Sequence, residues 1–201
     1  MAPAPGHLGR GPGSHAVLFY YDVAELAGQV SDYALAAIRE RGMAIVIATP
    51  AHRHMIADRL VQAGLDLAAA RANGSYLPLD ARETMRRFMA DDWPSPASFW
   101  QAVSPMVARA TETGRPVHVF GEMVSLLWDA GLVNAAIEVE AMWNELGAQY
   151  PFSLLCAYPA GSPAGDHHQD ALAEVCRVHS AVLGAAPDLG AVPGPGQPGR
   201  G

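Results

Sequence analysis

Glu122 is the residue whose type and position most directly suggest a functional site. It belongs to the stretch Val117–Trp128 (VHVFGEMVSLLW), where a short apolar run ends at Gly121 and a second apolar run of helical character follows. A strand that ends at glycine before a helix places these residues at the carboxyl edge of an open α/β sheet, where such sheets bind ligands. A carboxylate in the first turn of a helix is also stabilised by the helix dipole, by about 0.3–1 kcal/mol, without any function. Both interpretations of Glu122 stay open from its position alone.

Histidine and cysteine residues raise the question of a metal site. His52 and His54 are two residues apart at a predicted helix start, and side chains at that spacing point away from each other. A second candidate group lies near the end of the chain: His167, His168, Cys176 and His179. Cys176 and His179 would share a helix face, so zinc is geometrically possible, but His168 would lie about two turns away. We therefore expect no metal and no cofactor.

Nucleotide hydrolysis and nucleophilic catalysis find little support in the sequence. After the apolar run AVLFYY, where a phosphate-binding loop would lie, the chain reads YYDVAE, without the glycines that let backbone N–H groups approach a phosphate. Tyr20 and Tyr21 would obstruct a phosphate there, and Asp22 would repel it. No G-x-S-x-G motif is present, and Cys156 lies in an apolar run typical of a buried thiol. We expect no catalytic residues.

Composition narrows the class of protein further. Half of the 201 residues are hydrophobic, which suffices for a full core in one domain. The net charge of −7 and the absence of basic runs argue against direct nucleic-acid binding. No apolar stretch reaches the roughly 20 residues of a membrane span, and two cysteines make no disulfide framework. We expect a cytoplasmic protein that contacts no membrane.

The hydrophobic pattern predicts an α/β fold, with a mostly parallel sheet between two layers of helices. The expected strands are Ala16–Tyr21, Ala44–Thr49, Tyr76–Leu79, Val117–Phe120 and Phe152–Tyr158. Helices are expected between them, at Ala24–Arg41, Pro50–Gly64, Leu65–Ala72, Asp80–Met89, Ala97–Thr113, Met123–Ala130 and Leu132–Leu146, and at the end of the domain, at Gln169–Leu183. Asp91–Pro96 (DDWPSP) is expected to be a loop. Residues 15–183 would form the domain, and the Pro/Gly-rich segments 1–14 and 184–201 are expected to be disordered.

Several pieces of the sequence together resemble a known family. They are AVLFYY after His15, AIVIATPAHR at Ala44–Arg53, YLPLDARETMRRFM at Tyr76–Met89, VFGEMVSLLWDAG at Val119–Gly131, AIEVEAMWNEL at Ala136–Leu146, FSLLCAYP at Phe152–Pro159 and CRVH at Cys176–His179. These resemble the MEDS domain, the sensory domain named for methanogens, methylotrophs and the dichloromethane-responsive regulator DcmR. The resemblance covers about residues 15–183. One departure is His118, where the family pattern has arginine before the GEM piece.

The resemblance implies a relative of the RecA and KaiC fold that lacks the Walker A phosphate loop. It implies a sensor of small molecules, including hydrocarbon derivatives. Members of the family are often joined to DNA-binding or histidine-kinase-type output domains. No such domain is recognisable in this sequence. We therefore expect the output to pass through a separate partner, a histidine-kinase-type protein or a transcriptional regulator.

Strand-end positions and the family pieces together suggest a ligand site. The expected apolar walls are Tyr20, Tyr21, Trp128 and Tyr158. The expected polar contacts are His15, Thr49, His52, Glu122 and Glu140, with Asn144 one helical turn after Glu140. Two alternatives stay open: a degenerate RecA-like interaction module that docks a kinase or an anti-sigma-type regulator, and an enzyme with Glu122 or Asp80 as general base.

Overall fold

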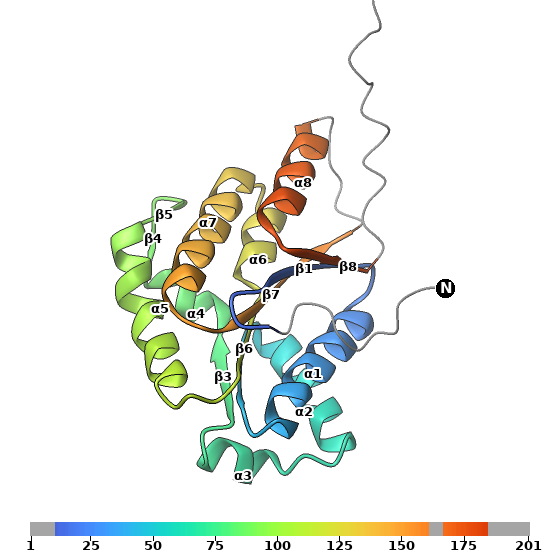
Figure 1. Cartoon of the computed structure of the whole chain (residues 1–201). Coiled ribbons are helices and arrows are strands. Elements are labelled where there is room, and N and C mark those ends of the chain that lie inside the picture. The colour runs from blue at the N-terminus through green and yellow to red at the C-terminus, as the bar shows by residue number, and fades with distance from the viewer. Residues whose placement is uncertain (1–10, 161–166, 185–201) are drawn as a thin grey trace, which may run out of the picture.

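A six-stranded sheet forms the centre of the structure, a computed structural model that describes residues 11–160 and 167–184 (Figure 1). The strands of this sheet are β1 (His15–Tyr20), β2 (Met43–Ala48), β3 (Tyr76–Asp80), β6 (Val117–Gly121), β7 (Ser153–Pro159) and β8 (Ala181–Leu183). They lie in the order β3-β2-β6-β7-β1-β8, and every neighbouring pair is parallel. The predicted α/β class is confirmed, with a main sheet that is entirely parallel.

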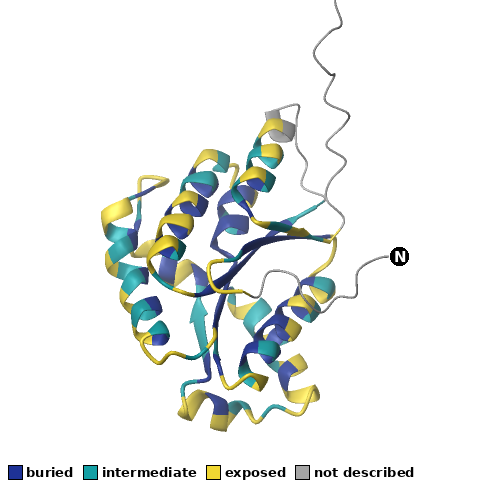
Figure 2. Cartoon of the chain, viewed as in Figure 1, coloured by how far each residue is buried: buried dark blue, intermediate teal, exposed yellow. Residues whose placement is uncertain are grey.

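Helices cover both faces of the sheet. They are α1 (Val23–Arg39), α2 (Pro50–Gln62), α3 (Leu67–Ala72), α4 (Ala81–Arg86), α5 (Pro96–Thr111), α6 (Met123–Asp129), α7 (Val133–Gln149) and α8 (His167–Val178). Alternate residues of each strand face opposite sides. Val17 and Phe19 of β1 pack in the core beneath α4 to α8, whereas Ala16 and Leu18 pack in the core beneath α1 to α3. Figure 2 shows the inner part of the sheet buried between these layers, whereas the edge strand β3 is only partly buried.

Short polar side chains cap five of the helices whose starts lie within the described residues. Each accepts a hydrogen bond from the backbone N–H three residues further on. The capping residues are Asp22, Thr49, Asp66, Asp80 and Ser95. Such a cap typically contributes about 1 kcal/mol to stability.

The end of the domain differs from the sequence prediction. A helix was expected over Gln169–Leu183, but α8 ends at Val178 and the chain turns into β8. This short strand pairs with Ala16–Leu18 of β1. Three residues carry too little periodic signal to be recognised as a strand, and their conformation depends on the exposed edge of β1.

A second difference lies in the predicted loop Asp91–Pro96. Two-residue strands, β4 (Met89–Ala90) and β5 (Trp93–Pro94), form a small antiparallel pair there. Asp91 and Asp92 connect them with φ of 47° and 61°, the left-handed region that Asp adopts more readily than most residues. Residues 1–10 and 185–201, most of the predicted disordered ends, lie outside the described residues.

Candidate functional site

Three predicted site residues meet at the carboxyl edge of the sheet. We call Thr49, His52 and Glu122 the edge cluster. Glu122 follows β6 and Thr49 follows the neighbouring strand β2, so the parallel pairing of these strands brings them together. The carboxylate of Glu122 accepts hydrogen bonds from the Thr49 backbone N–H (2.7 Å) and hydroxyl (3.2 Å). Its Oε1 lies 2.7 Å from Nδ1 of His52.

The buried carboxylate of Glu122 shifts the pKa values of the titratable groups around the edge cluster. Contact with the Glu122 carboxylate raises the pKa of His52 against the lowering effect of burial. Burial and the charge of Glu122 also raise the pKa of Asp129, and burial together with Glu122 and Asp129 raises the pKa of Tyr20 to about 12. Only 2% of Glu122 is exposed, and both of its oxygens already have partners on α2 or at its cap. The arrangement therefore fixes the start of α2 against β6.

Four other predicted residues lie in a different place. Pairwise contacts link His15, Glu140, Asn144 and Tyr158 on the face of the sheet that α7 and α8 cover. Tyr158 Oη donates to Glu140 Oε1 (2.8 Å), and His15 Nε2 lies 3.2 Å from Glu140 Oε2. His15 Nδ1 lies 2.9 Å from Asn144 Oδ1. The single pocket that the sequence suggested is thus divided between two groups of residues.

Two residues of this second group were not predicted to be there. Cys156 donates to Glu140 Oε2 (3.1 Å), and His179 Nε2 lies 3.4 Å from Glu140 Oε1. His15, Glu140, Cys156 and His179 are all buried, and one ligand atom from each lies within 4.8 Å of the others. We call these four residues the buried cluster. His179 was considered with Cys176, His167 and His168, but it meets Cys156; the side chains of His167 and His168 lie outside the described residues.

A signal for the buried cluster existed in the strand alternation. His15 and Val17 share one face of β1, and Cys156 and Tyr158 share one face of β7. The register aligns Val17 with Cys156, so these two faces are the same side of the sheet. Strand pairing and register are needed to see this, and neither can be read from one strand alone.

Burial and the neighbouring charges together determine the protonation of the buried cluster. Burial by itself would raise the pKa of Glu140, but His179 and His15 hold it well below its usual range. Burial and the neighbouring Glu140 raise the pKa of the Cys156 thiol and of the Tyr158 hydroxyl well above their ordinary values. In the protein alone, Glu140 is therefore a carboxylate and Cys156 a thiol.

The two remaining predicted apolar walls, Tyr21 and Trp128, differ in their surroundings. Tyr21 is 65% exposed, whereas Trp128 is buried and packs edge-on against Tyr158, with ring centroids 5.2 Å apart.

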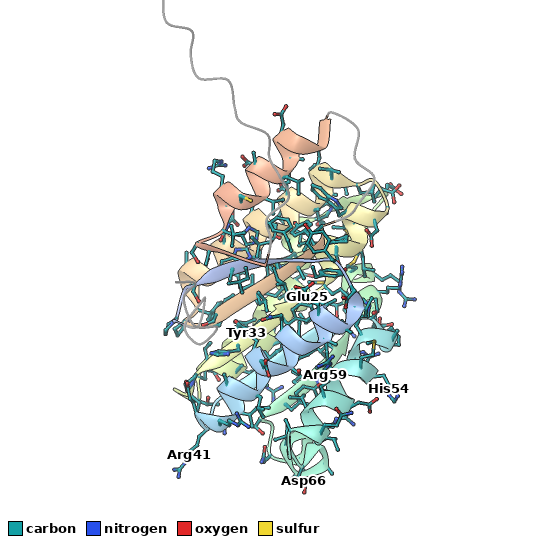
Figure 3. All side chains as sticks on the ribbon, turned by 90° about the vertical axis from the view of Figure 1, so that its right-hand side faces the viewer. Glu25, Tyr33, Arg41, His54, Arg59 and Asp66 are labelled. Carbon is teal, nitrogen blue, oxygen red and sulfur yellow. The ribbon has the colours of Figure 1, made fainter. Side chains whose placement is uncertain are left out.

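His118, the departure from the family pattern, is buried and stacks on Tyr33 of α1. Figure 3 shows Tyr33 beside the sheet and His54 on the outer side of α2; the side chain of His54 is 80% exposed, against 18% for His52.

The turn between β1 and α1 carries acidic groups where a phosphate would bind. Asp22 caps α1 by accepting from Glu25 N–H (2.7 Å), and the Glu25 carboxylate accepts from Tyr21 N–H (3.1 Å). Carboxylates thus occupy the N–H groups that helix N-termini offer to anions. This agrees with the sequence argument against a phosphate loop.

A groove of about 590 Å³ runs beside the edge strand β3. We call it the β3 groove. Its apolar lining comes from Met43, Leu77, Leu79, Ala102 and Met106, which pack against the core. Its polar lining includes Asp80, Glu83, Arg87, Arg109 and Arg115. The volume falls within the roughly 300–1,000 Å³ of small-molecule sites.

Comparisons with known proteins assign the family. Among the described residues 11–160 and 167–184, no helix is long and apolar enough to cross a membrane. A search of curated proteins finds no match to the chain. One family's sequence model, described as "MEDS: MEthanogen/methylotroph, DcmR Sensory domain", matches residues 14–180. The match covers most of the 201 residues and the whole of the main sheet except β8, so the chain belongs to the MEDS family of sensory domains.

Proposed function

We propose that this protein is a non-catalytic sensor that binds a small, largely apolar molecule of the hydrocarbon-derivative type and signals to a separate output protein. The observation that carries the proposal is the β3 groove, because it combines an apolar floor with a few charged groups at the rim. Such a lining favours a ligand with an apolar body and one polar end. Membership of a sensory family supports the signalling role.

The groove suits this ligand better than the edge cluster does. Thr49 and His52 already engage both oxygens of Glu122, and a ligand there would have to displace them. In the groove, a ligand would instead cover Leu77, Leu79 and Met106, which are only partly buried. Covering apolar surface contributes about 25 cal/mol per Å².

A route from the groove to the rest of the molecule runs through α2. Asp80 lines the groove and forms an ion pair with Arg53 of α2 (2.9 Å). The neighbouring His52 contacts Glu122 at the start of α6. The first turn of α2 is therefore held by two carboxylates, one at the groove and one at the edge cluster. A ligand that moves Asp80 would change its ion pair with Arg53 and, through the adjacent His52, the contact with Glu122. The position of α2 would then change. An output partner, such as a histidine-kinase-type protein or a transcriptional regulator, could detect that change.

The experiment is a thermal-shift and calorimetry screen with halogenated and oxygenated small hydrocarbons, and with Mg-nucleotides as the comparison set. A ligand at a hundred times its Kd stabilises the folded state by about 2.7 kcal/mol, which should raise Tm by several degrees. A shift with the hydrocarbon set alone is expected. A shift with nucleotide alone would contradict the proposal, and no shift with either set would favour the interaction module.

Groove variants locate the bound ligand. Ala102→Phe fills the groove and should weaken binding at least about tenfold. Gln101→Phe, on the exposed side of the same helix and outside the groove lining, should leave affinity unchanged. Glu122→Gln tests the edge cluster: if it abolishes binding while Ala102→Phe does not, the ligand binds at the carboxyl edge and the groove assignment is wrong.

A further inference from the structure

The buried cluster brings together four metal-binding side chains from four separate elements. His15 begins β1, Glu140 lies in α7, Cys156 lies in β7, and His179 follows α8. None of them is more than 9% exposed, and Glu140 and Cys156 are fully buried. Imidazole, thiolate and carboxylate are the groups that zinc binds in proteins.

The distances match the spacing of ligands around one ion. His15 Nε2 lies 3.3 Å from Cys156 Sγ and 3.2 Å from Glu140 Oε2. Cys156 Sγ lies 3.1 Å from the same carboxylate oxygen. Zinc–nitrogen bonds of about 2.0 Å and zinc–sulfur bonds of about 2.3 Å place tetrahedral ligands roughly 3.3–3.5 Å apart. The ligand atoms of His15, Glu140 and Cys156 therefore already lie close to the spacing of a tetrahedral site. The fourth ligand comes from His179, and the ligand atoms of all four residues lie within 4.8 Å of one another.

Both imidazole rings are held so that Nε2 points inward. His15 Nδ1–H donates to Asn144 Oδ1 (2.9 Å), and His179 Nδ1–H donates to the Val175 carbonyl (2.6 Å). Asn144 is itself oriented, because its Nδ2 donates to the Val178 carbonyl (3.1 Å). Such outer hydrogen bonds set the tautomer of metal-binding histidines. Nε2 of His179 is buried without a hydrogen bond, 3.4 Å from Glu140 Oε1.

Charge and orientation of the carboxylate fit a divalent ion as well. A thiolate and a carboxylate together neutralise two positive charges, so the filled site would carry no net charge into the core. Tyr158 donates to Oε1 of Glu140 (2.8 Å) and leaves Oε2 facing His15 and Cys156. This orientation favours a single bond from Oε2 to the ion.

We propose that His15, Glu140, Cys156 and His179 form a closed site for one divalent transition-metal ion of the zinc class. All four positions are filled by buried protein ligands, which is typical of structural rather than catalytic zinc. The ion would fasten the end of the domain, through His179, onto β1, β7 and α7. This inference is independent of the ligand proposed for the β3 groove.

The experiment is titration of the full-length chain, freed of metal by a chelator, with Co²⁺ and then with Zn²⁺. We expect one equivalent of Co²⁺ to bind, with a thiolate-to-cobalt charge-transfer band and the visible absorption of a tetrahedral site. Zn²⁺ should displace the cobalt and raise Tm. Failure of the folded, metal-free protein to bind one equivalent of either ion would overturn the proposal and leave the cluster as a metal-free ion-pair network.

The two cysteines provide a matched pair of variants. Cys156→Ser should abolish the charge-transfer band, whereas Cys176→Ser, outside the four-residue cluster, should retain it with unchanged stoichiometry. Asn144→Ala should weaken metal affinity by about 10–100-fold through loss of the hydrogen bond to His15. A band that survives in Cys156→Ser but disappears in Cys176→Ser would contradict the assignment, even if every variant folds.

Discussion

At the scale of single residues, the two buried carboxylates have distinct roles. Glu122 connects strand ends to the start of α2, through Thr49 and His52. Glu140 is surrounded by two histidines, a thiol and a phenol. Burying a carboxylate is costly unless it is paired, and each of these carboxylates has several partners. Removal of either carboxylate should therefore also disturb the side chains that contact it.

The contact between His52 and Glu122 predicts a pH dependence of stability. Because the folded protein raises the pKa of His52 above 6.5, this contact contributes fully below that pH. The contribution is lost as the pH rises through the raised value. We expect the free energy of unfolding of wild type to exceed that of His52→Gln by about 1 kcal/mol at pH 6, and by less at pH 9. Urea denaturation at both pH values measures the difference.

His54→Gln is the control for this prediction. His54 lies on the same helix and is 80% exposed at its side chain, with Asp58 3.6 Å away. An exposed pair of this kind contributes little to stability. The variant should therefore follow the wild-type curve. A difference between wild type and His52→Gln that stays constant over the whole pH range would contradict the role of the Glu122 contact.

At the scale of the elements, the connection between α1 and β2 depends on close backbone approach. A Cβ at Gly42 would lie 2.3 Å from the Pro116 carbonyl oxygen and 2.9 Å from that of Ala37. Gly42 also donates to the Ala37 carbonyl (2.7 Å), where the chain leaves α1 for β2. The loop before β6 thus packs directly on this turn, and no side chain fits between them.

Gly42→Ala should therefore destabilise the fold by about 2–4 kcal/mol, because backbone at two places must move. Gly147→Ala in α7 should instead stabilise the fold. A Cβ there meets nothing within 4 Å, and alanine in a helix is favoured over glycine by about 1 kcal/mol. Thermal or urea unfolding of both variants tests the pair, and equal effects would show that the close approach at Gly42 has been misjudged.

At the scale of the whole molecule, the sheet is strongest at its centre. β6 and β7 each pair on both sides and are almost wholly buried. β8 pairs only with β1, spans three residues and is partly exposed. Regions with few buried contacts open at lower free energy than the core. The molecule therefore combines a rigid centre with an edge at β8 that is attached mainly by β1 and α8.

Hydrogen exchange tests this gradient. Amides of residues 181–183 should exchange many times faster than those of β6 and β7 in the metal-free protein, because they open without global unfolding. Peptide-resolved deuterium uptake would measure it, with β2, also central, as the internal comparison. Equal protection of β8 and the central strands would mean that the end of the domain unfolds only with the whole.

Local sequence determined much of the fold of this protein. The caps at Thr49 and Asp80, the apolar strands and the helical stripes depend on residues a few positions apart, so they are legible in the chain. The resemblance to the family predicted a sensory domain over residues 15–183, and the family model matches residues 14–180. The local pattern also placed Thr49 and Glu122 at strand ends, but only the sheet order makes their strands, β2 and β6, neighbours.

Only the tertiary structure decided where β8 lies and which residues meet at Glu140. The contact of His15 with Cys156 joins residues 141 positions apart, and it depends on the parallel register of β1 and β7. A shift of that register by one residue would turn Cys156 to the other face of the sheet. His179 reaches the same point only because the chain turns after α8 to add β8 beside β1. Such meetings arise from packing of the whole chain, which no local pattern encodes.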